Sequence, residues 1–196
     1  GIHQELVLGR LERLKENATR ALLIHRQGFF YGEIVHTVYD CVDAYAKLLN
    51  IEYEILLGRK NQRVTLKIAF HKTDLHHLIG FHYLLDSPEL NQTEKKIFDA
   101  LQKRKISNRQ IETSRHYAKI KGRIEFLPLL ESIFDDNKTV FKYNEVLNNF
   151  SLIKAEYLLK NTIESKNVFT FLSKSQDETY FCRSFFPQEK IDYSVG

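Results

Sequence analysis

Apolar residues recur with one period early in this 196-residue chain and with another late in it, and this change limits the folds that the chain can adopt. Up to residue 50 they are spaced three and four apart, which predicts amphipathic helices over 4–25 and 31–49. From residue 140 onward, short aromatic and β-branched runs alternate with polar residues, which is typical of antiparallel strands. Helices and strands therefore occupy separate stretches of the chain.

The middle of the chain connects these two parts. The β-branched and aromatic runs at 51–57 and 64–70 predict a β-hairpin, because only a short polar loop separates them. Thr93 is expected to open a helix that continues to about residue 105, and Ser107 to cap the next. Gly122 and Pro128 predict that the helical stretch 107–134 is broken into short pieces.

This order of elements predicts an α+β fold in which N-terminal helices and a helical insertion pack on one antiparallel β-sheet. We expect a single domain over residues 1–196, since 43% apolar residues suffice for a substantial core. Its expected parts are listed in chain order: a helical N-terminal part, 1–50; a hairpin and histidine segment, 51–86; a basic helical insertion, 87–136; and antiparallel strands, 137–196.

The sequence argues against several classes of protein. There is no run of about 18 apolar residues and no signal peptide, so we expect no membrane partner and a cytoplasmic protein. Cys41 and Cys182 lack the spacing of a zinc ribbon or of a disulfide framework. Glycine-rich phosphate loops, His-Glu-x-x-His and Gly-x-Ser-x-Gly are absent, which argues against kinases, dehydrogenases and common hydrolases. We expect no cofactor.

Four of the eight histidines, His71, His76, His77 and His82, lie directly after the predicted hairpin. Histidine titrates near neutral pH, so proton transfer is one interpretation of this segment, and half-buried helical histidines are the other. Spacings of five and six residues do not align two imidazoles on one helical turn. We therefore expect no metal site.

Residues 95–123 hold ten Lys or Arg against Asp99 and Glu112, a net charge of +8, so that the other 167 residues carry −4 of the total of +4. Such a local basic block suits the phosphate backbone of a nucleic acid, and a solvated helical face is the alternative interpretation. The candidate nucleic-acid-binding residues are Lys103, Arg104, Lys105, Arg109, Arg115, Lys119 and Lys121.

Three short motifs carry a family resemblance: His-Leu-Ile-Gly at 77–80, Arg-Ile at 123–124 and Arg-Ser at 183–184. With them, the chain resembles the fourth phage-associated family of BECR nuclease-like domains, named for barnase, EndoU, colicin and RelE. The resemblance runs from about residue 51 to the end. Ile79 stands where the family usually has threonine, and the family pattern leads us to expect a further strand after Gly196.

The resemblance implies a metal-independent ribonuclease fold whose active site lies on the concave face of the sheet. It also implies a toxin or effector of a phage or mobile element, with RNA as substrate and an antitoxin or immunity protein as a possible partner. Cleavage through the 2′-hydroxyl needs a group that removes its proton, a group that protonates the leaving 5′-oxygen, and stabilisation of a phosphorane. The alternative is an inactive nucleic-acid-binding or protein-interaction module on the same fold.

The expected catalytic residues follow from these needs. His77 matches the histidine of the family and is expected to act as general base or acid. Arg183 is expected to hold the scissile phosphate through bidentate contacts, with one further hydrogen bond from Ser184. Lys154 and Arg123 are further candidates, each either catalytic or a surface cation. The alternative for Arg183 is an ordinary strand cation paired with Asp177 or Glu178.

Overall fold

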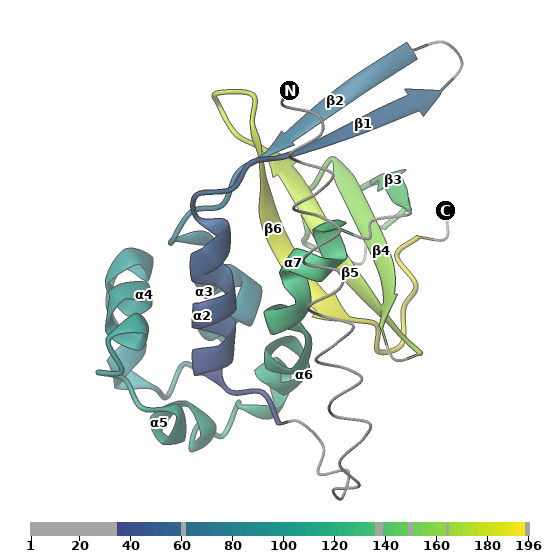
Figure 1. Ribbon diagram of the computed structural model, residues 1–196. Helices are drawn as coiled ribbons and strands as arrows, with labels where there is room; N and C mark the ends of the chain where they lie inside the picture. The colour runs from purple at the N-terminus through teal and green to yellow at the C-terminus, as the bar shows by residue number, and fades with distance from the viewer. Residues whose placement is uncertain (1–34, 60–61, 136–138, 149–150, 164, 195–196) are drawn as a thin grey trace, which may run out of the picture. The chain divides into compact units, whose positions relative to one another are not determined.

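The computed structural model describes residues 35–59, 62–135, 139–148, 151–163 and 165–194. Helices gather beside a single sheet, and a two-stranded hairpin projects from one corner of that sheet (Figure 1). The helix predicted over 4–25 lies outside the described residues. No helix among the residues described here is long and apolar enough to cross a membrane.

The first described helix, α2 (Val38–Leu48), coincides with the later part of the helix predicted over 31–49. It begins at Val38 because Thr37 caps it: Thr37 Oγ1 accepts from the Asp40 main-chain N–H, and Asp40 accepts from the Thr37 N–H. The other helices are α3 (Asp74–Ile79), α4 (Glu94–Gln102), α5 (Asn108–Glu112), α6 (Ala118–Phe126) and α7 (Leu130–Asp135), with short 3₁₀ turns η1 (Phe81–Tyr83), η2 (Pro88–Leu90) and η3 (Leu127–Leu129).

The predicted interruptions of the helical stretch were half right. Pro128 lies in η3, where α6 ends and α7 begins. Gly122 does not interrupt a helix but lies inside α6. A Cβ at this position would come within 3.1 Å of Pro187 Cγ, so the glycine allows α6 to lie close against the last strand. The expected helix break at Gly122 was wrong. The glycine is needed for packing against Pro187, and a contact between residues so far apart in the chain cannot be predicted from the local sequence.

Six strands form one sheet in the order β1-β2-β6-β5-β4-β3. Their bounds are β1 (Tyr53–Arg59), β2 (Gln62–Ile68), β3 (Val140–Lys142), β4 (Tyr157–Ile163), β5 (Lys166–Lys174) and β6 (Tyr180–Pro187). All neighbours are antiparallel except β2 and β6, which meet in parallel at the single pair Ile68 and Tyr180. The α+β class with one sheet is confirmed, and the sheet is mixed.

The one-residue contact between β2 and β6 has a structural consequence. Beyond Tyr180, the edge of β6 that faces β2 has no strand partner, and α3 and α6 pack there instead. The two faces of the sheet also differ. Cys182 and Phe185 belong to the large core shared with the helices, whereas Phe186 packs in a smaller aromatic core on the opposite face with Phe171.

Candidate active site

Strand β6 carries a β-bulge at the predicted Arg-Ser motif. Two consecutive residues of β5 pair with Cys182 and Ser184, so Arg183 is an extra residue without a pair in the ladder. Cys182 and Phe185 are three positions apart and are both buried in the helix-side core, which a regular strand would not permit. The bulge therefore presents Arg183 and Ser184 together on the opposite face of the sheet.

Arg183 is exposed and has no ion pair with any residue in the described part of the chain. The two carboxylates proposed as its structural partners are occupied elsewhere. Glu178 pairs with Lys174 at 3.0 Å, and Asp177 accepts from the hydroxyl of Thr179 at 2.7 Å. The guanidinium is thus free to bind an anion.

Arg123, in contrast, is 8% exposed and holds two elements together. Its Nη1 donates to the carbonyl oxygen of Phe185 at 2.8 Å, on the edge of β6 that lacks a strand partner. The same nitrogen lies 3.3 Å and 3.4 Å from the carbonyl oxygens of Leu78 and His77, in the last turn of α3. One guanidinium therefore donates hydrogen bonds to carbonyl oxygens that have no partner within the sheet or within the helix.

Arg123 also opens onto a cleft of about 670 Å³ between η1, α6 and the segment that follows β6. We call it the Arg123 cleft, and its chemically distinctive lining residues are Tyr83, Lys119, Arg123, Ser184, Phe186 and Tyr193. The guanidinium carbon lies 5.6 Å from the ring centroid of Tyr83 and 5.3 Å from that of Phe186. A buried cation between aromatic rings is suited to a phosphate with stacked bases beside it.

The charge of Arg123 is not balanced by a nearby carboxylate. Within the described residues no Asp or Glu oxygen lies within ion-pair distance of it, and Glu189 at the border of the cleft acts on it only over a longer range. Burial lowers the pKa of the guanidinium. The side chain nevertheless stays charged, because an arginine pKa lies far above neutral pH.

Three of the four clustered histidines come together beside this cleft. The ring centroids of His76 and His77 in α3 lie 5.4 Å apart, and that of His82 in η1 lies 5.7 Å from His77 and 6.4 Å from His76. Gly80 makes the approach possible, since it ends α3 in the left-handed region at φ 87° and turns the chain back. Tyr83 connects the cluster to the cleft, with its ring centroid 4.1 Å from His82.

The environment keeps two of these imidazoles neutral at pH 7. Partial desolvation of the His82 ring, whose residue is still exposed at the surface, lowers its pKa to about 4, and the positive charge of Arg123 adds to this effect. Burial also lowers the pKa of His76, with a smaller contribution from His77. Neutral imidazoles can accept a proton or a hydrogen bond. Among the residues that the structure describes, no group of three or more His, Cys, Asp or Glu is arranged to hold a metal ion.

The structure brings together some of the residues expected in the site and separates others. Arg123 and Ser184 line one cleft, and Arg183 shares a sheet face with Ser184. Neither His77 nor Arg183 lines the Arg123 cleft, although the His77 ring centroid lies 5.7 Å from that of His82. Lys154 is exposed beside the cleft, where its carbonyl accepts from a β5 serine hydroxyl.

Sequence reasoning missed Tyr83 and Tyr193 in the cleft. Aromatic residues are expected mainly in the core, so neither tyrosine was singled out. The one available signal was the position of Tyr83 directly after His82. The sequence-based interpretation also treated His76 and His82 as structural histidines and gave a catalytic role to His77 alone. The Gly80 turn brings the imidazoles of His77 and His82 together without a regular helix.

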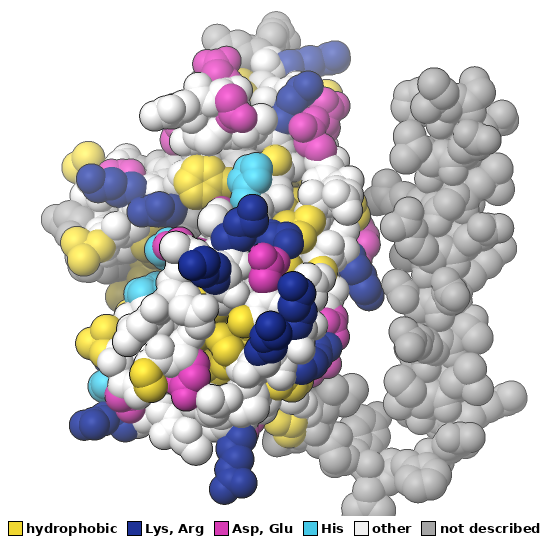
Figure 2. All heavy atoms as spheres, turned by 90° about the vertical axis from the view of Figure 1, so that its left-hand side faces the viewer, with side chains coloured by type: hydrophobic (Ala, Val, Ile, Leu, Met, Phe, Trp, Pro, Cys, Tyr) yellow, Lys and Arg dark blue, Asp and Glu magenta, His cyan; other side chains and the backbone are white. Residues whose placement is uncertain are grey.

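The basic block divides into free and engaged side chains. Lys103, Lys105, Arg109 and Lys121 are exposed and form no ion pair with the residues described. Arg115 lies 3.4 Å from an Asp86 carboxylate oxygen, and Lys119 lines the Arg123 cleft. Figure 2 shows Lys and Arg side chains gathered on the face over α4.

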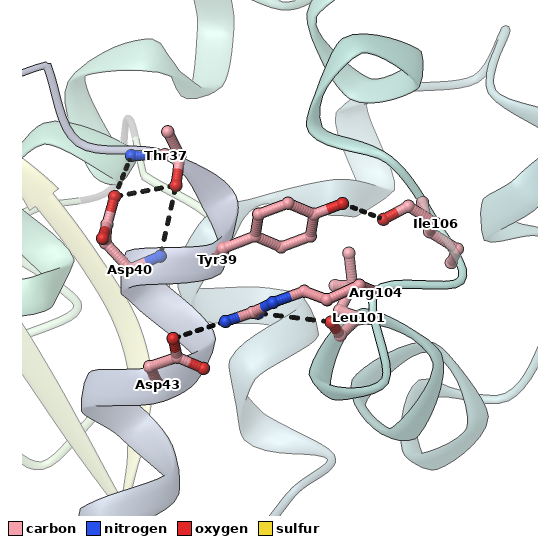
Figure 3. Close-up of polar contacts among 7 residues, drawn as sticks. All are labelled: Thr37, Tyr39, Asp40, Asp43, Leu101, Arg104 and Ile106. Atoms are coloured by element: carbon pink, nitrogen blue, oxygen red, sulfur yellow. Dashed lines mark hydrogen bonds and ion pairs between the residues drawn. The ribbon is translucent and has the colours of Figure 1, made fainter.

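Arg104 contributes to packing as well as to charge. Its guanidinium pairs with Asp43 of α2 at 2.5 Å and lies 4.2 Å from the ring centroid of Tyr39. The Tyr39 hydroxyl in turn donates to the carbonyl oxygen of Ile106 at 3.0 Å (Figure 3). These contacts fix the segment after α4 against α2, so Arg104 offers less free charge to a ligand than its lysine neighbours.

A family model described as phage-Barnase-EndoU-ColicinE5/D-RelE like nuclease4 matches residues 37–195. No match was found among curated proteins, and none among solved structures. The matched range starts at the cap of α2 and includes the histidine cluster, the Arg123 cleft and the bulge of β6. The resemblance noted in the sequence is thereby confirmed and extended to α2: this chain belongs to the phage-Barnase-EndoU-ColicinE5/D-RelE like nuclease family 4 and is a nuclease-like domain.

Proposed function

We propose that this domain cleaves single-stranded RNA without a metal ion, by attack of a 2′-hydroxyl on the adjacent phosphate at the Arg123 cleft. Arg123 supports this most directly. It is a buried guanidinium with no carboxylate at ion-pair distance in the described part of the chain, and it faces a cleft lined by aromatic rings. A buried charge is costly unless it is paired, and a phosphate would supply the missing anion.

Two imidazoles beside the cleft can move the protons. In the proposed step His82, neutral at pH 7, takes the proton of the 2′-hydroxyl, and the 2′-oxygen attacks phosphorus. The bond from phosphorus to the 5′-oxygen breaks, and the imidazolium form of His77, 5.7 Å from His82 between ring centroids, gives that oxygen a proton and becomes a neutral imidazole. The products are a 2′,3′-cyclic phosphate and a 5′-hydroxyl.

Cations on the sheet and in the cleft would stabilise the phosphorane. Arg183 and Ser184 lie on one face of β6 because of the bulge, and Ser184 also lines the Arg123 cleft. Preorganised donors of this kind contribute strongly where charge develops in a transition state. Lys103, Lys105 and Lys121 would hold the RNA backbone outside the site, since they are exposed and without ion pairs to described residues.

The family description names phage together with barnase, EndoU, colicin E5/D and RelE. We therefore propose that the domain acts as a toxin or effector of a phage or mobile element, and that an antitoxin or immunity protein holds it inactive. The cleft itself is the surface that such a partner would have to cover.

The test compares wild type with His77→Ala and Arg183→Ala on labelled RNA in excess EDTA, and Arg63→Ala is the matched control. Arg63 is exposed on the hairpin and does not line the Arg123 cleft. We expect wild type and control to release 2′,3′-cyclic phosphates, and each test variant to be about 10² to 10⁴-fold slower.

Salt-sensitive RNA binding by the wild type without any cleavage would contradict the proposal. It would favour the second candidate, a nucleic-acid-binding module without catalysis. The exposed lysines would suffice for that function, and the absence of His77 from the cleft lining is the observation that favours it.

A further inference from the structure

A second cavity, of about 820 Å³, lies on the other side of the histidine cluster. Its walls are the turn after α3 on one side and, on the other, the start of α4 with the loop before it. We call it the α4 cavity. His82 lines this cavity and the next residue, Tyr83, lines the Arg123 cleft, with 4.1 Å between the two ring centroids. Two consecutive residues in contact thus line the two cavities, which places the cavities next to each other.

The α4 cavity has a floor of apolar side chains, although polar atoms make up the larger part of its exposed lining. Phe81, Leu84 and Leu90 are buried there, and Leu85 stands at the rim with 85% of its surface exposed. The faces of a nucleobase suit such a floor.

The polar groups are held by the loop and by the first turn of α4. Asn91 makes no side-chain hydrogen bond to any residue described, so both its amide donor and its acceptor are available. Gln92 also lines the cavity and uses its Nε2 to donate to the Glu89 carbonyl at 2.8 Å, while its Oε1 accepts no hydrogen bond from a described residue. Glu94 adds a carboxylate without an ion pair in the described structure.

The histidine side of the α4 cavity also holds a polar atom without a hydrogen-bond partner. His76 Nδ1 is buried and has no hydrogen-bond partner, although the side chain lines the cavity. A buried polar atom of this kind costs free energy unless something pairs with it. Lys96, also in the lining, places a positive charge at the cavity, as a phosphate next to a bound base would require.

We propose that the α4 cavity binds one unpaired nucleobase next to the scissile phosphate and prefers a base with an exocyclic amino group to uracil. The preference comes from Glu94, whose carboxylate only accepts hydrogen bonds and so favours an amino group at the base edge. The base must be unpaired, because pairing would occupy that edge. This inference rests on the proposed cleavage of RNA and assigns its sequence preference.

The experiment uses oligouridine substrates with one A, C or G at a defined position, and maps where wild type and Glu94→Gln cut. Wild type should cut next to the inserted base faster than at uridines. In Glu94→Gln this ratio should fall roughly tenfold, since a carboxamide also donates and no longer discriminates. Glu52→Gln is the matched control, because Glu52 is exposed and outside both cavities.

A second readout does not need cleavage. Adenosine 5′-monophosphate titrated into the wild-type protein should shift the NMR signals of His76 more than uridine 5′-monophosphate does. Cleavage at equal rates beside all four bases, or an unchanged ratio in Glu94→Gln, would overturn the base preference and leave the nuclease proposal standing. Selective shifts of His76 in a protein that cuts no RNA would overturn the nuclease proposal and support the cavity as a base-binding site.

Discussion

Arg123 Nη1 donates a 2.8 Å hydrogen bond to the carbonyl oxygen of Phe185, so an α-helix side chain closes the strand edge where β2 has left β6. The same guanidinium lies between the rings of Tyr83 and Phe186 at the wall of the cleft. One residue thus links the architecture of the sheet to the proposed chemistry. Arg183, the cation of the Arg-Ser motif, is exposed and makes no comparable contact with the residues that the structure describes.

The two arginines should therefore respond differently to truncation. Arg123→Ala leaves buried carbonyls of Leu78 and Phe185 without a donor, which should lower the free energy of unfolding by about 2 kcal/mol. Arg183→Ala should change it by less than about 0.5 kcal/mol, because the side chain is exposed and unpaired among described residues. Urea unfolding of both variants measures this difference. Equal stability of the two would contradict a structural role for Arg123.

Gly80 and Gly58 form a second matched pair. Gly80→Ala should cost about 1 to 3 kcal/mol, because φ is 87° and the new Cβ would lie 3.0 Å from Tyr83 Cδ2 and 3.2 Å from Arg123 Cδ. Gly58→Ala should be nearly neutral, since nothing lies within 4 Å of its Cβ position. Thermal unfolding followed by circular dichroism compares them, and a neutral Gly80→Ala would show that this turn can relax.

The free energy of unfolding should decrease as the pH is lowered, over a pH range that is set by the pKa of His82. Its pKa is about 4 in the folded protein, below the value of about 6.5 for an unfolded chain, so the unfolded state binds more protons between these pH values. The free energy of unfolding should therefore decrease as pH falls from 6.5 toward 4, by about 1 kcal/mol after allowance for solvent screening. Unfolding at pH 7 and 4.5 measures it. His82→Asn should flatten the pH dependence, and an unchanged slope would contradict it.

The free lysines at the end of α4 should act on RNA binding and not on folding. Lys103→Ala with Lys105→Ala removes two exposed charges, which should reduce the slope of log affinity against log salt by about 1.4 for a single strand. Fluorescence anisotropy at several salt concentrations gives the slope. The control is Lys47→Ala with Lys142→Ala, two exposed lysines of α2 and β3, and an equal effect of the two pairs would argue against a defined RNA path.

Arg104 should behave in the opposite way to its lysine neighbours. Arg104→Ala removes the ion pair with Asp43 and the contact with the Tyr39 ring, and should lower the free energy of unfolding by about 1 kcal/mol. Lys103→Ala is the control and should be neutral. Chemical unfolding separates them. A neutral Arg104→Ala would show that the contacts in Figure 3 add nothing to stability.

Several elements were predictable because their signals are local. The hairpin of β1 and β2 and the strands from β3 to β6 follow from runs of β-branched and aromatic residues between polar ones, and the Ser107 cap of α5 follows from the preference of serine for the N-cap. The histidine segment and the Arg-Ser motif could be singled out in the same way, since a residue type and its position relative to a strand are visible in the sequence. The site residues themselves remain predictions.

The sequence by itself determined the order of helices and strands, because the period of apolar residues is a property of neighbours along the chain. Only the tertiary structure decided the parallel contact of β2 and β6, the cleft at Arg123 and the meeting of His77 with His82 around Gly80. These depend on residues tens of positions apart, or on a single left-handed turn. No local pattern specifies them, because they are fixed by how the whole core packs.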